Sequence, residues 1–463
     1  MRPAAPSVRW LFSIHFWLLL ILWSFLPSRA FPLLHWDGLS VDSRDLPLLI
    51  AAFVTLFNKR LFRFLGSACS RFWAGLVLFC FYCLVSFLWS TLDTADKYAM
   101  GLSLALFAAS VTFAYSYTSI LSQTDLQAVC LGSTLFVAAT GVLYSADSFF
   151  TLGLRGAAFA VKEDAFGIVR VGGPLYGSST GYFVLVPALG FVGDQFLRKG
   201  GRKLSYVLAG VALALTLIGL GSRGGLLVAV VFVALALSAV LSPQTLLKVG
   251  VFLLILTFST LALLSSLETT ERLYHPEDEG RWKLHAKAFQ ILKHRSVIEN
   301  VAGSGYGSVW PWYRLDSAIF RRQYWQQVQT EYGLYTAGQY LYHSHSVFLF
   351  AVVELGLPGS LCLFALVGTL WRIYALSRKL GMWRLGAAGL AASGLGLFLD
   401  LFLFYRPRQC LIWWVWLFSL IRLLTEREAR PIAWLAVTDY ELPGVHAKPP
   451  KTSMEYELGA GGS

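Results

Sequence analysis

The chain has 463 residues, of which 56% are apolar and 14% charged, and its formal net charge is +12. A typical soluble domain has about 25% charged residues, so this chain cannot cover its apolar side chains with polar ones in water. The composition excludes an ordinary soluble enzyme, a disordered regulator and a fibrous protein. Because the apolar runs are long and continuous rather than alternating, they predict an all-α polytopic membrane protein and not a β-barrel.

Twelve stretches are candidate transmembrane helices, since a span needs about 20 mostly apolar residues. The first is interpreted as a membrane anchor because no small-residue cleavage site convincingly follows it, and the second is unusually short. The twelve ranges are 9–27, 46–58, 72–91, 97–119, 127–148, 178–197, 204–220, 224–241, 246–266, 346–374, 384–404 and 409–424.

Basic residues are distributed unevenly between the two sides of these spans. If the N-terminus is cytoplasmic, the cytoplasmic segments carry 18 Lys and Arg, and the short loops on the other side carry 9. Cytoplasmic loops are enriched in Lys and Arg, so this bias predicts that both termini are cytoplasmic and that the number of spans is even. Orientation thus explains much of the net charge that would suggest nucleic acid in a soluble protein, and no nucleic-acid partner is expected.

One external loop is far longer than the rest and divides the chain. We expect spans one to nine over 1–266, a large and partly helical external loop over 267–345, and spans ten to twelve over 346–430. The loop is rich in Trp and Tyr, which argues against disorder, and long ordered loops are usually functional. Residues 431–463 are predicted to form a polar cytoplasmic tail that ends in GAGGS, the composition of a flexible linker.

The sequence offers little sign of a metal or a cofactor. Cys80 and Cys83 form a CxxC, but no second pair or nearby His accompanies it, and the six cysteines lie mostly in apolar runs. We therefore predict no structural disulfide and no zinc site. The glycines of GSGYG (303–307) follow no strand, and no Walker motif is present, so neither ATP nor NAD is expected.

Arg223 lies in a very tight external turn, within the sequence LIGLGSRGGLLVAV. The flanking glycines let backbone N–H groups approach a ligand, and an Arg fork beside free amides suits a phosphate. The alternative is an Arg that reaches out of the membrane to the interface. We favour the phosphate-binding interpretation.

His343 and His345 are predicted at the mouth of the tenth span, where the long loop returns to the membrane. Histidine can be neutral or charged near pH 7, so it suits a general base or a proton shuttle. An HxH pair can also be half of a metal site, but no Cys, Asp or Glu cluster accompanies it. A structural, hydrogen-bonded histidine is the other alternative.

Two acidic residues, Glu354 and Asp400, are predicted deeper in the membrane. Charges there are costly and are functional candidates by default. For Glu354 we favour a structural hydrogen bond to a neighbouring helix or loop over proton coupling. Arg406 and Arg408 are predicted on the external face, where they bind a polar headgroup or anchor the chain at the interface.

Four features together resemble the O-antigen ligase and O-antigen polymerase superfamily of bacterial inner-membrane glycosyltransferases. They are SRGG around Arg223, the segment GRWKLHAKAFQILKHRSVIENVAGSGYGSVW, the segment HSVFLFAVVELGLPG, and the twelve-span layout with one large loop before that last segment. The third is the most specific. The chain departs from the family at Ser346, where Asn is common, at His285, where an aromatic is common, and at 297–298, near which a proline usually stands.

The resemblance implies a GT-C-like fold and a role in lipopolysaccharide biosynthesis. It implies an enzyme that takes a glycan from undecaprenyl pyrophosphate at the periplasmic face and joins it to lipid A–core, by metal-independent, inverting transfer without a cofactor. We assign the pyrophosphate to Arg223 and Arg281, with Arg170 as a third cation. His345 is assigned as the base or the acceptor-orienting group, supported by His343. The polyprenyl chain is expected in a groove between helices that is open to membrane lipid.

Three alternatives compete with the ligase. An O-antigen polymerase joins the glycan to another undecaprenyl-linked repeat; we favour the ligase because the long loop carries 9 Lys and Arg, which would attract the phosphorylated lipid A–core. A protein O-oligosaccharyltransferase is disfavoured by the short tail. A secondary transporter is disfavoured because no two-fold repeat is visible and the charges gather at one face rather than at the midplane.

Overall fold

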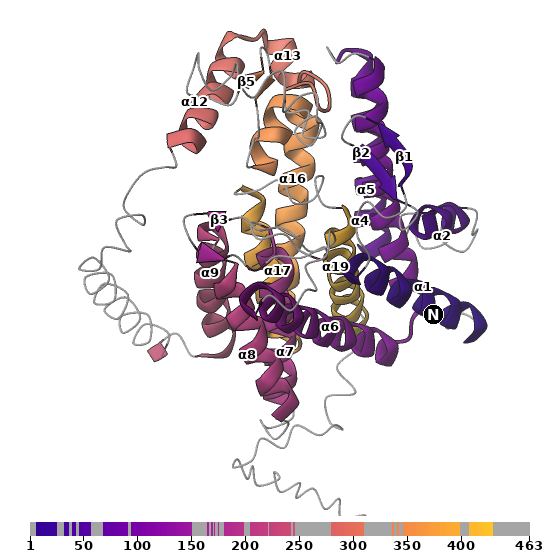
Figure 1. Ribbon diagram of the computed structural model, residues 1–463, viewed down its shortest axis with the longest axis vertical. Coiled ribbons are helices and arrows are strands. Elements are labelled where there is room, and N and C mark those ends of the chain that lie inside the picture. Colours follow the sequence, from indigo (N-terminus) through magenta and orange to yellow (C-terminus); the bar gives the residue numbers. More distant parts are fainter. Residues whose placement is uncertain are drawn as a thin grey trace, which may run out of the picture.

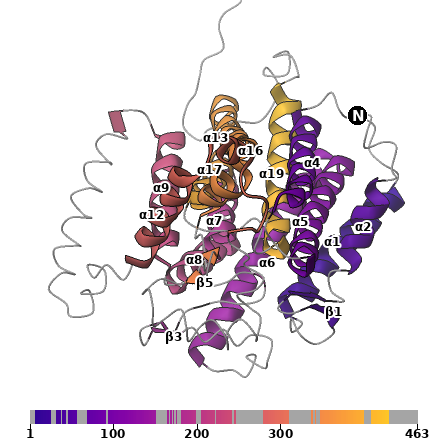
Figure 2. The ribbon, with the colours of Figure 1, turned by 90° about the horizontal axis from the view of Figure 1, so that it is seen from above.

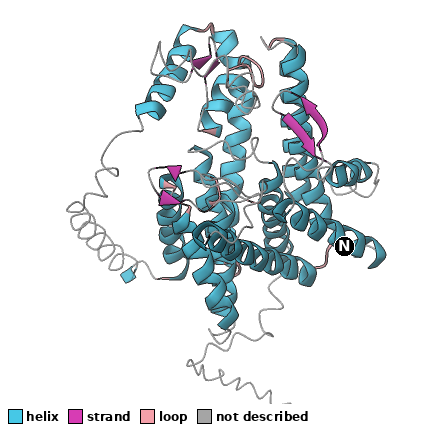
Figure 3. Ribbon diagram, in the orientation of Figure 1, coloured by secondary structure: helices cyan, strands magenta, loops and turns pink. Residues whose placement is uncertain are grey.

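The computed structural model describes residues 6–25, 32–36, 39–42, 46–56, 68–90, 94–150, 164–165, 168–169, 171, 175, 180–198, 204–220, 222–241, 244–245, 279–309, 336–337, 340–341, 346–398 and 407–428. This part of the chain is almost entirely helical (Figure 3). The strands in it form three antiparallel pairs, β1 (Pro32–Trp36) with β2 (Leu39–Asp42), β3 (Asp164–Ala165) with β4 (Ile168–Val169), and β5 (Thr336–Ala337) with β6 (Tyr340–Leu341). The predicted helical class is confirmed apart from these short pairs.

A helix lies at eleven of the twelve predicted spans, and the span predicted at 246–266 lies outside the described residues. Two further helices, α12 (Glu279–His294) and α13 (Val297–Ala302), lie in the predicted long loop, and the 3-10 helices η1 (Ser86–Leu88) and η4 (Gly396–Phe398) follow α4 and α17. The eleven are α1 (Pro6–Phe25), α2 (Leu46–Leu56), α4 (Ala68–Val85), α5 (Thr94–Ile120), α6 (Gln123–Phe150), α7 (Tyr182–Arg198), α8 (Leu204–Gly219), α9 (Arg223–Val240), α16 (Val347–Leu380), α17 (Arg384–Leu395) and α19 (Pro407–Glu428).

Four stretches of the described helices are long and apolar enough to cross a membrane: Ala68–Leu88, Met100–Ile120, Gln123–Asp147 and Val347–Leu380. Shorter apolar helices accompany them, at Arg9–Phe25, Leu204–Gly219, Gly224–Val240 and Arg384–Phe398. These helices support a multi-pass membrane protein. The number of twelve spans and the external position of the long loop stay predictions.

Contacts between helix ends agree with the alternating direction of the predicted spans. One set joins the starts of α1, α6 and α17 to the ends of α5, α7, α16 and α19, all of which the prediction puts on the same side. Its contacts include Arg9 Nη1–Asp125 Oδ2 (3.1 Å), Arg422 Nη1–Leu121 O (2.7 Å), Lys379 Nζ–Glu428 Oε1 (3.5 Å) and Asp194 Oδ2–Gly386 N (2.7 Å). We call this side the charged end.

The opposite helix ends also contact one another. The end of α6 meets the end of α1, the end of α4 meets α13, and Val171, two residues after β4, pairs with the end of α8. The contacts are Tyr144 Oη–Ser24 O (3.0 Å), Tyr82 Oη–Ala302 O (2.6 Å) and Val171 N–Gly219 O (2.8 Å). We call this side the loop end, because it holds α13 of the long loop. Which of the two ends faces the cytoplasm stays a prediction.

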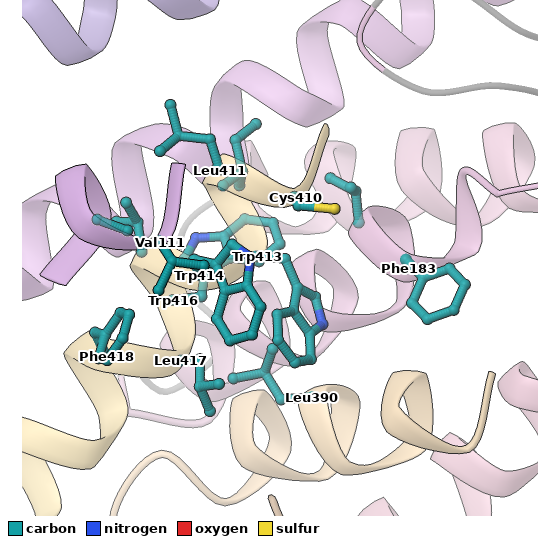
Figure 4. Packing of buried hydrophobic residues seen from close by; sticks show 14 of the residues in the cluster. Val111, Phe183, Leu390, Cys410, Leu411, Trp413, Trp414, Trp416, Leu417 and Phe418 are labelled. Carbon is teal, nitrogen blue, oxygen red and sulfur yellow. The ribbon is translucent and has the colours of Figure 1, made fainter. Parts of the chain in front are cut away.

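The core is organised around α19, which lies between α17 and α5 in both views of the ribbon (Figures 1 and 2). Its residues Trp413, Trp414 and Trp416 are completely buried, and Figure 4 shows them at the centre of the packed side chains. The indole N–H of Trp413 donates to Ser393 Oγ on α17 (2.9 Å), and that of Trp416 donates to Ser133 Oγ on α6 (2.8 Å). Hydrogen bonds as well as apolar packing thus tie α19 to helices on two sides.

Helices α7 and α17 approach so closely that only glycine fits between them. A β-carbon at Gly190 of α7 would overlap the carbonyl oxygen of Leu385 on α17. The Asp194 carboxylate of α7 then accepts hydrogen bonds from the backbone N–H groups of Leu385 (3.1 Å) and Gly386 (2.7 Å). Helix starts leave such N–H groups without an intrahelical partner, so Asp194 caps α17 from a neighbouring helix.

The contact between α7 and α17 predicts unequal costs for two Gly→Ala substitutions. Gly190→Ala should lower the free energy of unfolding by about 1–3 kcal/mol, because the added methyl group must push α17 away. Gly75→Ala on α4 is the matched control, since nothing lies within 4 Å of its β-carbon position. Thermal unfolding of both variants in detergent checks this, and equal melting temperatures would contradict the close approach.

Candidate functional site

Residues 303–307, GSGYG, form a loop whose three glycines all have positive φ: 74° at Gly303, 99° at Gly305 and 75° at Gly307. This region of backbone space favours glycine because other side chains clash with their own backbone there. Close approach adds a second requirement, since a β-carbon at Gly303 would overlap the carbonyl oxygen of Glu354. The glycines are therefore required by the conformation and packing of the loop itself.

The Glu354 carboxylate holds this loop. Its Oε2 accepts a hydrogen bond from Gly307 N (2.6 Å), and its Oε1 accepts one from Val309 N (2.8 Å), while the Glu354 residue is fully buried. Hydrogen bonds to a buried carboxylate offset its loss of hydration. The predicted structural hydrogen bond between Glu354 and a neighbouring loop is confirmed, with the carboxylate as the acceptor.

A break in α16 exposes the backbone groups that meet the loop. Gly356 has φ 59° and ψ −141°, which is not helical, and Pro358 follows it. Pro358 has no N–H, so the Glu354 carbonyl oxygen lacks its usual helical donor and accepts from Gly305 N instead (2.8 Å). The Val353 carbonyl oxygen likewise accepts from Arg295 Nη1 (2.7 Å). The segment ELGLPG thus breaks α16, and the carbonyl groups freed by the break bind the 303–307 loop and Arg295.

The end of α4 and the turn after it form the other wall of the loop. Tyr82 Oη donates to the Ala302 carbonyl (2.6 Å), and Trp89 Nε1 donates to the Gly303 carbonyl (3.1 Å). On the same side, Ser86 Oγ accepts from Tyr306 N (2.9 Å). Burial raises the pKa of the Tyr306 hydroxyl well above its usual value. We call residues 303–309 together with Glu354 and Gly356 the glycine latch.

Sequence reasoning missed two parts of this latch. It did not identify the contribution of α4, and it did not predict the break in α16. The available signals were the aromatic residues at the end of the α4 span and the Gly-Leu-Pro sequence that follows Glu354, which is unfavourable inside a helix. In the GSGYG loop and directly after it, the amides of Gly307 and Val309 are bound to Glu354.

The latch fixes α12 and α13 against α16. A capping box begins α13: Ser296 Oγ accepts from Glu299 N (3.3 Å), and Glu299 Oε2 accepts from Ser296 N (2.8 Å). Arg295, between the two helices, reaches the broken part of α16, and partial burial lowers the pKa of its guanidinium. Helix α12, which carries Arg281, is therefore attached to α16 through its C-terminal end.

Arg223 is the first residue of α9, in a short turn that ends at a capped helix start. Ser222 Oγ accepts from Gly225 N (3.1 Å), and Val171, beside β4, pairs with Gly219 before the turn. Helix α12 lies above α9 in Figure 1, and the two helices lie on the same side of the bundle in both views (Figures 1 and 2). A helix start carries partial positive charge, which suits an anion.

The predicted site residues fall into two groups. Arg223, Arg281 and Arg408 lie in α9, α12 and α19, but the structure describes only their backbone. Arg170, His343, His345, Arg406 and Asp400 lie outside the described residues. His345 directly precedes Ser346, whose Oγ accepts from Leu349 N (3.3 Å) and caps α16. The helix at the tenth predicted span therefore begins at Val347, close to the expected start at 346 and directly after its capping serine.

The described residues contain no group of three or more His, Cys, Asp and Glu side chains that could hold a metal ion. All six cysteines are free thiols.

Replacing Glu354 should loosen the glycine latch. In Glu354→Gln an amide N–H would face the N–H of Gly307 or Val309, so we expect a loss of about 2 kcal/mol or more in the free energy of unfolding. Hydrogen exchange at the Gly307 and Val309 amides should become faster in this variant, while exchange at the backbone amides of α19 should change less. Glu428→Gln is the matched control, because Glu428 is partly exposed and pairs only with Lys379 in the described structure. Unchanged protection of the Gly307 and Val309 amides would contradict this role.

A comparison with known families now adds independent evidence. A family model described as "O-Antigen ligase" matches residues 208–364, from α8 to the middle of α16. Among curated proteins none matches the chain. The matched segment contains the Arg223 turn, α12, the glycine latch and the start of α16, and members of this family are glycosyltransferase-like enzymes that act on lipid-linked glycans. Residues 208–364 are thus similar to the O-antigen ligase family, and this match supports a protein of the O-antigen ligase and polymerase family.

Proposed function

We propose that the protein is an O-antigen ligase. It transfers a glycan from undecaprenyl pyrophosphate to lipid A–core at the periplasmic face of the bacterial inner membrane, by metal-independent, inverting glycosyl transfer. The observation that carries this proposal is the family match over 208–364 together with the latch inside it, which attaches α12 to the start of α16. The contacts between helix ends support it further, because they put the Arg223 turn and α13 at the same end of the bundle, the loop end.

The chemistry of this transfer needs cations and a base more than it needs a metal. The pyrophosphate leaving group already carries negative charge, so groups that hold it and stabilise the charge that grows in the transition state accelerate the reaction. Arg223 and Arg281 take this role, with Arg170 as a third cation. His345, supported by His343, removes the proton of the acceptor hydroxyl or orients it.

The acceptor assignment rests on charge. The long loop carries 9 Lys and Arg, and Arg406 and Arg408 precede or begin α19 on the side predicted to be external. The same loop also carries 8 Asp and Glu, so its net charge is about +1, and attraction for the phosphates of lipid A–core is local to individual cations. A polymerase acceptor is also a lipid pyrophosphate, which keeps the polymerase as the second candidate.

The site assignment is tested by transfer assays on reconstituted protein with undecaprenyl-pyrophosphate glycan and purified lipid A–core. Arg223→Ala, Arg281→Ala and His345→Ala should each reduce kcat/KM by about 100-fold or more, as the loss of a group that stabilises transition-state charge or moves a proton does. Lys293→Ala is the matched control, because Lys293 is an exposed cation on the same helix as Arg281.

The same assay separates this mechanism from its alternatives. Wild-type rates in the arginine and histidine variants would show that the site is wrong. The chelator EDTA should leave the rate unchanged, whereas a loss of activity that zinc or magnesium restores would contradict metal-independent transfer.

The choice between ligase and polymerase is tested in a deletion strain by gel analysis of lipopolysaccharide. We expect free polymer and bare lipid A–core, because a ligase acts after the polymer is complete. A core that carries a single repeat would instead identify the protein as the polymerase. Restoration of the wild-type pattern by the Lys293→Ala variant, but not by Arg281→Ala, ties the result to the proposed site.

A further inference from the structure

A groove of about 740 Å³ lies between α1, α5 and α6. It belongs to the charged end, away from the glycine latch, and neither the reaction nor the family match extends to it. Its volume lies within the range of about 300–1,000 Å³ that small-molecule sites span. The walls are mostly apolar, with Trp17, Leu18 and Ile21 of α1 on one side and Ala128 and Val129 of α6 on the other.

The groove is open toward the outside of the helix bundle. Trp10 and Ile14, which line it, are 70% and 53% exposed, and Leu18 and Ile21 of the same helix are also exposed. In a helix predicted to lie in a membrane, such side chains face lipid rather than water. An apolar chain can therefore enter the groove from the surrounding bilayer without displacing a packed segment of the described structure.

One end of the groove is charged. Arg9 Nη1 donates to Asp125 Oδ2 (3.1 Å), and both side chains line the groove and remain partly exposed. The Nε atom of Arg9 is buried but finds no hydrogen-bond partner in the described part of the chain. A buried donor without an acceptor costs free energy, and because the rest of the Arg9 side chain stays partly exposed on the groove, an anion that enters the groove can bind this guanidinium.

A cation and an anion side by side match a headgroup that contains both charges. The Arg9 fork suits a phosphate, and the Asp125 carboxylate suits a primary ammonium, which can donate hydrogen bonds to it. An anionic headgroup without an amine would meet Asp125 with like charge. A quaternary ammonium has no N–H to donate. The charges thus favour a phosphate that carries a primary amine, attached to apolar chains.

We propose that this groove binds one phospholipid of the phosphatidylethanolamine class, with its phosphate on Arg9, its ammonium on Asp125 and an acyl chain along α1 and α6. The lipid fills the space between α1 and the bundle and so helps to hold α1 in place. With the predicted orientation, it belongs to the cytoplasmic leaflet, on the side opposite the transfer reaction. The site is independent of the ligase assignment.

Native mass spectrometry of the full-length protein in detergent tests this proposal, with palmitoyl-oleoyl phosphatidylethanolamine, phosphatidylglycerol and phosphatidylcholine added separately. The wild type should retain one phosphatidylethanolamine per chain in preference to the other two. Arg9→Ala should weaken that retention by about tenfold or more, as the loss of a charge-assisted hydrogen bond does. Arg71→Ala is the matched control, because Arg71 is an exposed cation on α4 that does not line the groove.

Two further variants keep the test independent of folding. Asp125→Asn keeps the shape of the side chain and should abolish the preference for phosphatidylethanolamine over phosphatidylglycerol within one sample. Ala128→Trp fills the groove and should reduce retention of every lipid at this site. Equal retention of phosphatidylglycerol and phosphatidylethanolamine by the wild type, or an unchanged preference in Asp125→Asn, would overturn the proposal. The same holds if Arg9→Ala and Arg71→Ala lose lipid equally.

Discussion

The arrangement of the loop end depends on one buried carboxylate. Glu354 accepts hydrogen bonds from Gly307 N and Val309 N, and its own carbonyl oxygen accepts from Gly305 N. A carboxylate buried without such partners would be strongly unfavourable, so the loop and the carboxylate require each other. This is why a loop rich in glycine, which loses more conformational entropy on ordering than other sequences, is held in one conformation at the broken part of α16.

The latch has a consequence for the proposed chemistry. Arg281 is carried by α12 and His345 precedes α16, so two groups that are far apart in the chain depend on one set of contacts for their relative position. Misplacement of a catalytic group by about 1 Å can cost about 100-fold in rate, which makes the rigidity of such a set of contacts relevant even without direct contact to substrate. Arg295, which bonds the Val353 carbonyl, belongs to the same positioning set.

The sequence predicted the features that depend on local composition. Eleven predicted spans coincide with helices because hydropathy over about 20 residues is a property of the segment itself. The structural role of Glu354 was also predictable, since an acidic residue in an apolar helix needs a partner. Its partner was not, because the pairing with Gly307 and Val309 joins segments 45 to 47 residues apart. The hydrogen bonds from Tyr82 and Trp89 span more than 200 residues, so the aromatic residues at the end of α4 were visible in the sequence but their partners were not.

The charged end shows that much of the basic character of the chain is structural. Arg422 donates to the carbonyl groups that end α5, Arg384 donates to the Ala239 carbonyl near the end of α9 (3.0 Å), and Arg198 lies over the Trp383 ring at 4.1 Å from its centroid. Cations at helix C-termini donate hydrogen bonds to the last carbonyl groups, which have no intrahelical donor, and they interact favourably with the helix dipole. Arg422 and Arg384 are therefore satisfied by backbone carbonyls of the protein itself, whereas Arg198 keeps a buried Nη2 without a hydrogen-bond partner among the described residues. Arg9 also has a buried nitrogen without a partner, and it differs from Arg198 because it lines an open, mostly apolar groove, a position that indicates a ligand rather than another helix contact.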